Sequence, residues 1–194
     1  MKKLTRQDLL PLETYARLRG EFRARVMAHK KDRRVAIGPH ATLYFEDYLT
    51  MQYQVQEMLR AERIFEEAGI EDELEAYNPL VPDGSNLKAT FMLEYADSEE
   101  RQRALAQLVN VEDRVWLRVE GCEPVWAIAD EDLERETADK TSSVHFLRFE
   151  LSPAMVMAVK QGARIGMGID HAAYRHAIEA VPDNVRRSLM GDLD

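Results

Sequence analysis

The segment RVAIGPHATLYFEDYLTMQYQVQEMLRAERIFEEAG, residues 34–69, decides the fold because a strand pattern runs directly into a helix pattern. Its first part is rich in β-branched and aromatic residues, which predicts a strand over Arg34–Glu46 with a break at Gly38-Pro39. A helix is predicted over Asp47–Gly69, because apolar residues recur at spacings of four, three and seven. The residues that share this helix face are Met51, Val55, Met58 and Phe65.

Glu62 falls near the middle of this apolar face, between Met58 and Phe65. Burying a bare carboxylate is costly, so such a residue is expected to be paired, protonated or bound to a ligand. Glu62 is therefore the first candidate site residue. It pairs with an arginine, such as Arg148 or Arg114, or it acts as a catalytic general base whose pKa is raised by burial.

Two further segments repeat the pattern of a strand that ends in glutamate before a helix. Ala89–Glu94 resembles Ala41–Glu46, and Phe146–Glu150 nearly shares the pattern. The three terminal glutamates converge if the strands are neighbours, or they mark three separate helix N-termini. Residues 171–180 predict a short helix. The fold class predicted is α+β: a mainly antiparallel central sheet of about five to six strands with helices packed on it, plus an N-terminal helix.

Charge divides unevenly along the chain. Residues 1–34 hold 11 lysines and arginines against 4 acidic residues, whereas residues 35–194 carry a net charge of −16. We predict a basic N-terminal helical arm over 1–34 and a single α+β domain over 35–194. The arm is expected to pack on the acidic body, on a second copy of the chain as a homodimer, or on another acidic partner. The acidic body argues against nucleic acid as a partner.

Cysteine usage and hydrophobicity predict where the protein works. The single cysteine, Cys122, excludes an intrachain disulfide and is typical of a reducing compartment. The N-terminal lysines have no apolar stretch behind them, and no run approaches the ~20 apolar residues of a membrane span. We therefore expect a cytoplasmic protein without a membrane partner.

Histidines and glutamates are the main candidates for chemistry, because the sequence has no Walker loop, GxGxxG, CxxC, HExxH or GxSxG motif. His40 follows Gly38-Pro39 within the first predicted strand region. His145 is expected on the apolar face of a later strand, where it is either a ligand or a satisfied core residue. Together with Glu62 and Glu57, they predict a site for iron, manganese or zinc. Glu57 and Glu62 lie about 140° apart on their helix, so both cannot point squarely at one ion.

Two loops, Asp139–Ser143 and Asp83–Lys88, are rich in groups that bind anions. The first offers the ammonium group of Lys140 and the hydroxyls of Thr141, Ser142 and Ser143, and the second offers the ammonium group of Lys88. Donor-rich turns bind phosphate or carboxylate groups in many proteins. We predict a ligand-binding site if the two loops lie together, and ordinary solvated loops otherwise.

Four long runs make the chain resemble a bacterial family known as domain of unknown function 3501. They are Arg34–His40, Gln56–Arg63, Tyr77–Thr90 and Asp139–Leu151, and the resemblance covers nearly the whole chain. The family brings no established activity, so no catalytic roles carry over. The resemblance implies that the gene lies beside genes for rubrerythrin-like and iron–sulfur proteins. Such a gene neighbourhood implies a role in peroxide or iron metabolism and a redox or iron–sulfur protein as partner.

Three functions are consistent with these features. The first is an accessory protein that binds a metal ion or small ligand and is linked to redox or iron stress. The second is a small enzyme that uses Glu62 as general base on an anionic substrate held by the Lys140 loop. The third is an interaction module whose basic N-terminal helix docks on an acidic surface, where salt would weaken the contact.

Overall fold

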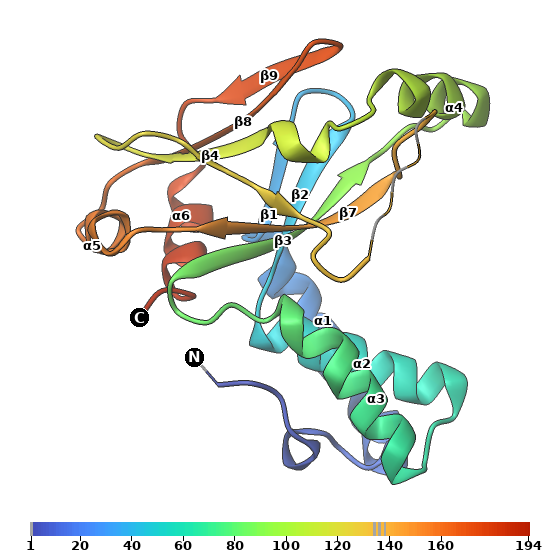
Figure 1. Ribbon diagram of the computed structural model, residues 1–194. Coiled ribbons are helices and arrows are strands. Elements are labelled where there is room, and N and C mark those ends of the chain that lie inside the picture. Colours follow the sequence, from blue (N-terminus) through green and yellow to red (C-terminus); the bar gives the residue numbers. More distant parts are fainter. Residues whose placement is uncertain (1, 134, 136, 138) are drawn as a thin grey trace.

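Two antiparallel sheets and six α-helices make up the computed structural model, which describes residues 2–133, 135, 137 and 139–194 (Figure 1). The helices are α1 (Leu12–Lys31), α2 (Tyr48–Glu62), α3 (Glu67–Tyr77), α4 (Ser98–Gln107), α5 (Pro153–Lys160) and α6 (Asp183–Met190). The strands are β1 (Arg34–Ile37), β2 (Ala41–Glu46), β3 (Asn86–Leu93), β4 (Val115–Val119), β5 (Val125–Trp126), β6 (Ile128–Ala129), β7 (Val144–Glu150), β8 (Ile165–His171) and β9 (Tyr174–Ile178). Single-turn 3-10 helices are η1 (Arg6–Asp8), η2 (Asn78–Leu80) and η3 (Glu112–Arg114). The predicted α+β class is confirmed.

The larger sheet contains β1, β2, β3, β7 and β6 in this spatial order, and each neighbouring pair is antiparallel. Alternation along β3 sets its orientation. The residues buried on its inner face are Leu87, Ala89, Phe91 and Leu93. Lys88 lies on the other face, opposite Glu46 of β2 and Arg148 of β7. A shift of one residue would exchange the two faces, so the apolar pattern specifies this register.

The smaller sheet contains β5, β4, β8 and β9, again with antiparallel neighbours. Its inner face consists of Val115, Leu117, Val119, Ile165, Met167 and Ile169, each at most 1% exposed. These residues form one apolar cluster with the inner face of the larger sheet. The predicted strands are thus divided between two sheets that share one core, rather than gathered in one central sheet.

Helices α1, α2 and α3 form a helical layer below the sheets in Figure 1. They contribute to a second apolar cluster, which includes Met51, Val55, Leu59 and Leu74. Asp47 caps α2, because its Oδ1 accepts a hydrogen bond from Thr50 N at 2.9 Å. None of the helices in the described residues is long and apolar enough to cross a lipid bilayer.

Helix α2 ends at Glu62, before the predicted end at Gly69. Arg63 adopts a left-handed backbone conformation with φ of 57°, which stops the helix. Phe65 therefore leaves the predicted apolar face and is 69% exposed, and Glu62 is exposed as well. The expectation that Glu62 is a buried carboxylate is wrong, because the apolar spacing continues past the residue at which the backbone turns.

Residues 171–180 do not form the predicted helix. They complete β8 and form β9, in a hairpin that pairs Asp170 with Arg175 and His171 with Tyr174. Alanines favour a helix locally. The side chain of Tyr174 is buried, however, and its hydroxyl donates to the Ile37 carbonyl at 2.7 Å. Contacts with β1 therefore outweigh the local propensity.

Arg33, the penultimate residue of the predicted basic arm, is 1% exposed. Its guanidinium donates to the carbonyl oxygens of Phe45 at 3.0 Å, Glu46 at 3.1 Å and Ser188 at 3.2 Å. It also contacts the Asp192 carboxylate, and its Nη1 lies 3.5 Å from Asp47 Oδ2. This one side chain joins the larger sheet to the C-terminal segment. The division of the chain after residue 34 stays a prediction.

Candidate functional site

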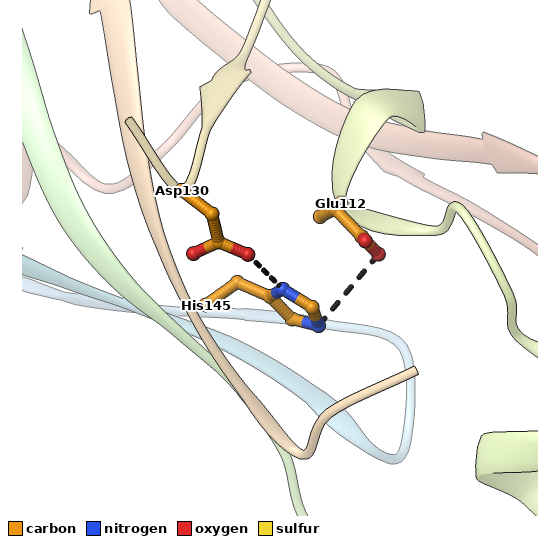
Figure 2. A group of neighbouring side chains, drawn as sticks. All are labelled: Glu112, Asp130 and His145. Atoms are coloured by element: carbon orange, nitrogen blue, oxygen red, sulfur yellow. Dashed lines mark hydrogen bonds and ion pairs between the residues drawn. The ribbon is translucent and has the colours of Figure 1, made fainter. Parts of the chain in front are cut away.

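Strand β7 places His145 in the apolar core. It shares a face with Leu147 and Phe149, which are both buried, and its own side chain is 0% exposed. A buried imidazole needs partners for both ring nitrogens, because an unpaired buried polar group is costly. Figure 2 shows the partners from the end of β6 and from η3, which are Asp130 and Glu112. The segment before β7 adds Thr141 as a further partner.

Asp130 holds the Nδ1 side of the ring. Its Oδ2 lies 2.6 Å from Nδ1, and its Oδ1 accepts hydrogen bonds from Phe146 N at 2.9 Å and Arg135 Nη1 at 3.1 Å. Asp130 has a positive φ of 48°, which aspartate tolerates better than most residues. A carboxylate in this position accepts the Nδ1 proton, so a neutral imidazole has its lone pair on Nε2.

Three oxygen atoms surround Nε2 of His145. Thr141 Oγ1 lies at 2.8 Å, the Ser142 carbonyl oxygen at 3.1 Å and Glu112 Oε2 at 3.6 Å. Glu112 comes from η3 and is 5% exposed. The Thr141 hydroxyl donates to Glu112 Oε2 at 3.1 Å, so its lone pairs are available to face Nε2.

Several acceptors face the same point. With the Nδ1 proton directed to Asp130, these are Nε2 of His145, the Ser142 carbonyl and the Glu112 carboxylate, and the Thr141 hydroxyl lies among them. A cation binds to a set of acceptors of this kind, as a second imidazole proton or as a metal ion. One ligand atom from each of Glu112, Asp130 and His145 lies within 4.8 Å of the others.

The order Asp130, His145, Thr141 resembles the carboxylate–imidazole–hydroxyl arrangement of hydrolases. In those enzymes the hydroxyl faces a substrate carbonyl. Here Thr141 is 2% exposed and donates its proton to Glu112. A substrate has no access to this hydroxyl, so the geometry favours binding of a cation over acyl transfer.

Among the described residues, His145 alone of the four residues predicted to bind metal belongs to this cluster. His40 stacks on Tyr95 with ring centroids 4.1 Å apart. Glu57 pairs with Arg19 at 2.7 Å, and hydrogen bonds from Arg19 lower the pKa of Glu57 to about 2. Both residues therefore have partners on other elements.

In the part of the chain that the structure describes, Glu62 does not have the partner that the predicted apolar face required. Arg148, one of its predicted partners, pairs instead with Glu131 at 2.8 Å and Glu150 at 2.6 Å. Because Glu62 is exposed at the end of α2, Glu62→Gln is expected to change the free energy of unfolding by less than about 0.5 kcal/mol. Urea unfolding followed by circular dichroism measures this change. A loss greater than about 1 kcal/mol would contradict the exposed position.

The residues predicted to bind an anion lie in two places. Thr141 and Ser142 belong to the His145 cluster, and Lys140 is exposed next to it. The Ser143 carbonyl accepts a backbone hydrogen bond from Leu93, at one end of β3. Lys88 lies near the other end of β3 and donates to the Pro79 carbonyl. The structure does not bring the two loops together.

The three strand-end glutamates have separate partners. Glu46 accepts from Thr90, Glu94 accepts from Thr42, and Glu150 accepts from Ser85. Because β2 and β7 are both antiparallel to β3, Glu94 lies at the opposite end of the sheet from the other two glutamates. They do not form one site.

Sequence reasoning missed Glu112 and Asp130. Their spacing from each other and from His145 follows no metal-binding motif, because η3, β6 and β7 meet only in the folded chain. The strand that delivers Asp130 consists of Ile128–Ala129 alone, which is too short to give a pattern.

Comparisons with known proteins identify relatives of the whole chain. A family model described as "Protein of unknown function (DUF3501)" matches residues 3–193, which confirms the resemblance. A crystal structure of a novel protein of unknown function from Burkholderia pseudomallei K96243 shares 56% sequence identity with the chain. It covers 100% of both chains with a TM-score of 0.95. No curated protein matches the chain.

Proposed function

Since the chain belongs to the DUF3501 family of proteins of unknown function, no inherited activity assigns a role to the buried cluster, and we propose that the cluster binds a divalent transition metal ion at Nε2 of His145. One observation carries the proposal. Three oxygen atoms, from Glu112, Thr141 and Ser142, meet the lone-pair side of one buried imidazole. An ion at this point would bind the imidazole lone pair and offset the negative charge of the buried carboxylate.

The distances suit a small ion. Ions bound by nitrogen and oxygen at about 2.0–2.2 Å keep neighbouring ligand atoms about 3.0–3.5 Å apart. Nε2 of His145 lies 3.1 Å from the Ser142 carbonyl oxygen and 3.6 Å from Glu112 Oε2. Small side-chain movements would therefore complete the coordination. Asp130 would retain the Nδ1 proton and orient the ring, as carboxylates next to metal-bound histidines do.

The donor set narrows the choice of metal. One imidazole nitrogen with carboxylate, carbonyl and hydroxyl oxygens suits iron(II), manganese(II) or zinc better than copper(I), which prefers sulfur ligands. Cys122 is not a member of the cluster in the described residues. The proposal therefore names iron, manganese or zinc.

Two neighbouring carboxylates of η3 provide a matched test. Glu112→Gln removes the buried candidate ligand with little change in size, and Asp113→Asn makes the same change at the exposed neighbour. We expect untagged wild type, purified without chelator, to bind one ion per chain. Asp113→Asn should bind equally well, and Glu112→Gln at least about tenfold more weakly. Elemental analysis and calorimetric titration with Mn²⁺ and Zn²⁺ measure this.

A further variant probes the orienting role of Asp130. Asp130→Asn is expected to weaken binding about 10- to 100-fold through loss of the carboxylate at Nδ1. Equal binding by wild type and Glu112→Gln would overturn the proposal. NMR provides a second test. If both ring N–H protons of His145 exchange slowly and persist at millimolar Mn²⁺ or Zn²⁺, the proposal is also overturned, because a second ring proton then occupies the place of the metal ion.

We further propose that the ion links the protein to redox or iron stress in the cytoplasm, with a redox or iron–sulfur protein or a second copy of the chain as partner. The family resemblance, the single cysteine and the donor set support this. Iron or manganese in protein purified without oxygen would favour it. Zinc alone would contradict the redox role and leave the ion site intact.

A further inference from the structure

Both tryptophans of the chain lie on the outer face of the smaller sheet. Trp116 of β4 is directly opposite Trp126 of β5, and the same cross-strand row continues through Gly168 of β8 to Ala177 of β9. Trp126 is 44% exposed. Two large flat rings are thus followed by two of the smallest side chains, which leaves a hollow beside the rings.

Gly168 allows the indole of Trp116 to lie on the strand. A Cβ atom at Gly168 would lie 2.4 Å from Cζ2 of Trp116, so a larger residue would displace the ring. Trp116 remains partly exposed in this position. The ring is therefore held against β8, and the guanidinium of Arg118 lies 5.7 Å from the ring centroid, so a ligand that packs on this ring would displace Arg118.

A pocket of about 490 Å³ occupies this face, within the size range of small-molecule sites. Its lining includes both tryptophans, Pro124, Arg118 and Arg175, together with the Asp170 carboxylate that pairs with Arg175. Arg118 lies opposite Gly166 and Arg175 lies opposite Asp170, so the two arginines flank the tryptophan row on opposite sides. The pocket thus combines aromatic surface with cations at both edges.

Both arginines have partners that an anion can replace. Arg118 pairs with Glu179 at 2.9 Å, and Arg175 pairs with Asp170 at 2.7 Å. The arginine side chains are 44% and 77% exposed. Exposed ion pairs of this kind are weak, so the guanidinium groups can turn to a ligand. Two such cations beside two tryptophans are distinctive in a chain with a net charge of −9.

We propose that this pocket binds a small planar aromatic anion of the nucleotide class. The base would pack against the indole rings, since aromatic side chains stack on every base. The phosphate would pair with one of the two flanking arginines, Arg118 or Arg175, because a guanidinium group binds phosphate through two parallel hydrogen bonds. The site lies on the outer face of the smaller sheet, whereas the His145 cluster is buried in the core, so it stands independently of the metal proposal.

Intrinsic fluorescence reports on this pocket alone, because both tryptophans of the chain line it. Titration with AMP is expected to quench the fluorescence and to reach saturation. Adenosine lacks the phosphate and ribose 5-phosphate lacks the base, so each should bind about tenfold more weakly than AMP. Excitation at the red edge of tryptophan absorption avoids absorption by the base.

A pair of variants separates the site from general charge effects. The double variant Arg118→Gln/Arg175→Gln is expected to weaken AMP binding at least about tenfold. The control Arg164→Gln removes an exposed arginine that pairs with Glu120 outside this pocket, and should bind AMP like wild type. Thermal unfolding checks that all variants are folded.

Three results would overturn the proposal. The first is the absence of saturable quenching at millimolar AMP, and the second is binding of ribose 5-phosphate as tight as that of AMP. The third is fluorescence that changes with protein concentration while sedimentation shows a dimer. In that case the tryptophan face would be an interface between two copies of the chain.

Discussion

Arg33→Met is expected to lower the free energy of unfolding by about 3–5 kcal/mol at neutral pH, and the melting temperature by roughly 6–20 °C. Methionine keeps an apolar stem of similar length but removes the guanidinium. The carboxylates of Asp192 and Asp47 then remain buried without their main counter-charge. Removing one partner of a buried ion pair is much more costly than the net contribution of the pair itself.

The neighbouring residue provides the control. Arg34 has a side chain that is 54% exposed and lies 3.9 Å from Glu94. Arg34→Met should therefore change the free energy of unfolding by no more than about 0.5 kcal/mol. Urea unfolding and calorimetry compare the two variants, and adding Asp192→Asn to Arg33→Met should restore part of the loss. Similar effects at Arg33 and Arg34 would show that the buried contacts are not responsible.

Asp192→Asn is expected to remove a pH dependence from the stability of the protein. Burial raises the pKa of Asp192 from 3.8 to about 6, against the opposing effect of the Arg33 guanidinium. Because the folded pKa lies above the unfolded one, protonation of Asp192 favours the folded state. This stabilisation is complete below about pH 4 and is lost as the pH rises through about 6. The difference between the two pKa values corresponds to about 3 kcal/mol.

The measurement compares urea unfolding of wild type and Asp192→Asn at about pH 4 and about pH 7. The stability of wild type relative to the variant should fall by about 2 kcal/mol over this range, since Asp192 is already partly ionised in the unfolded chain at about pH 4. The comparison largely cancels the titration of groups that do not interact with Asp192. A constant difference across the range would contradict the raised pKa.

Local patterns account for the part of the fold that could be predicted. The strands predicted around Ala89–Glu94 and Phe146–Glu150 correspond to β3 and β7, and the helix predicted from Asp47 onward is present as α2. The end of α2 was not predictable from apolar spacing, because the left-handed conformation of Arg63 interrupts a pattern that continues to Phe65. Likewise, β9 depends on pairing with β8 and not on its own composition.

The candidate site was predictable only in part, because its members meet through tertiary contacts. Alternation alone places His145 on the buried face of β7. Glu112 and Asp130 join it from distant segments, with no spacing that a sequence motif would record. The same limit applies to Arg33 and Arg34. They look alike within the basic arm, yet one is in the core and the other in solvent.

The full burial of His145 has a consequence for metal exchange. An ion held at Nε2 would leave or enter only when the structure around the cluster opens, because His145 is 0% exposed and Thr141 is 2% exposed. Metal binding of this kind is coupled to folding. The identity of the bound ion would then be set by the metals available while the chain folds, and it would persist after the supply changes.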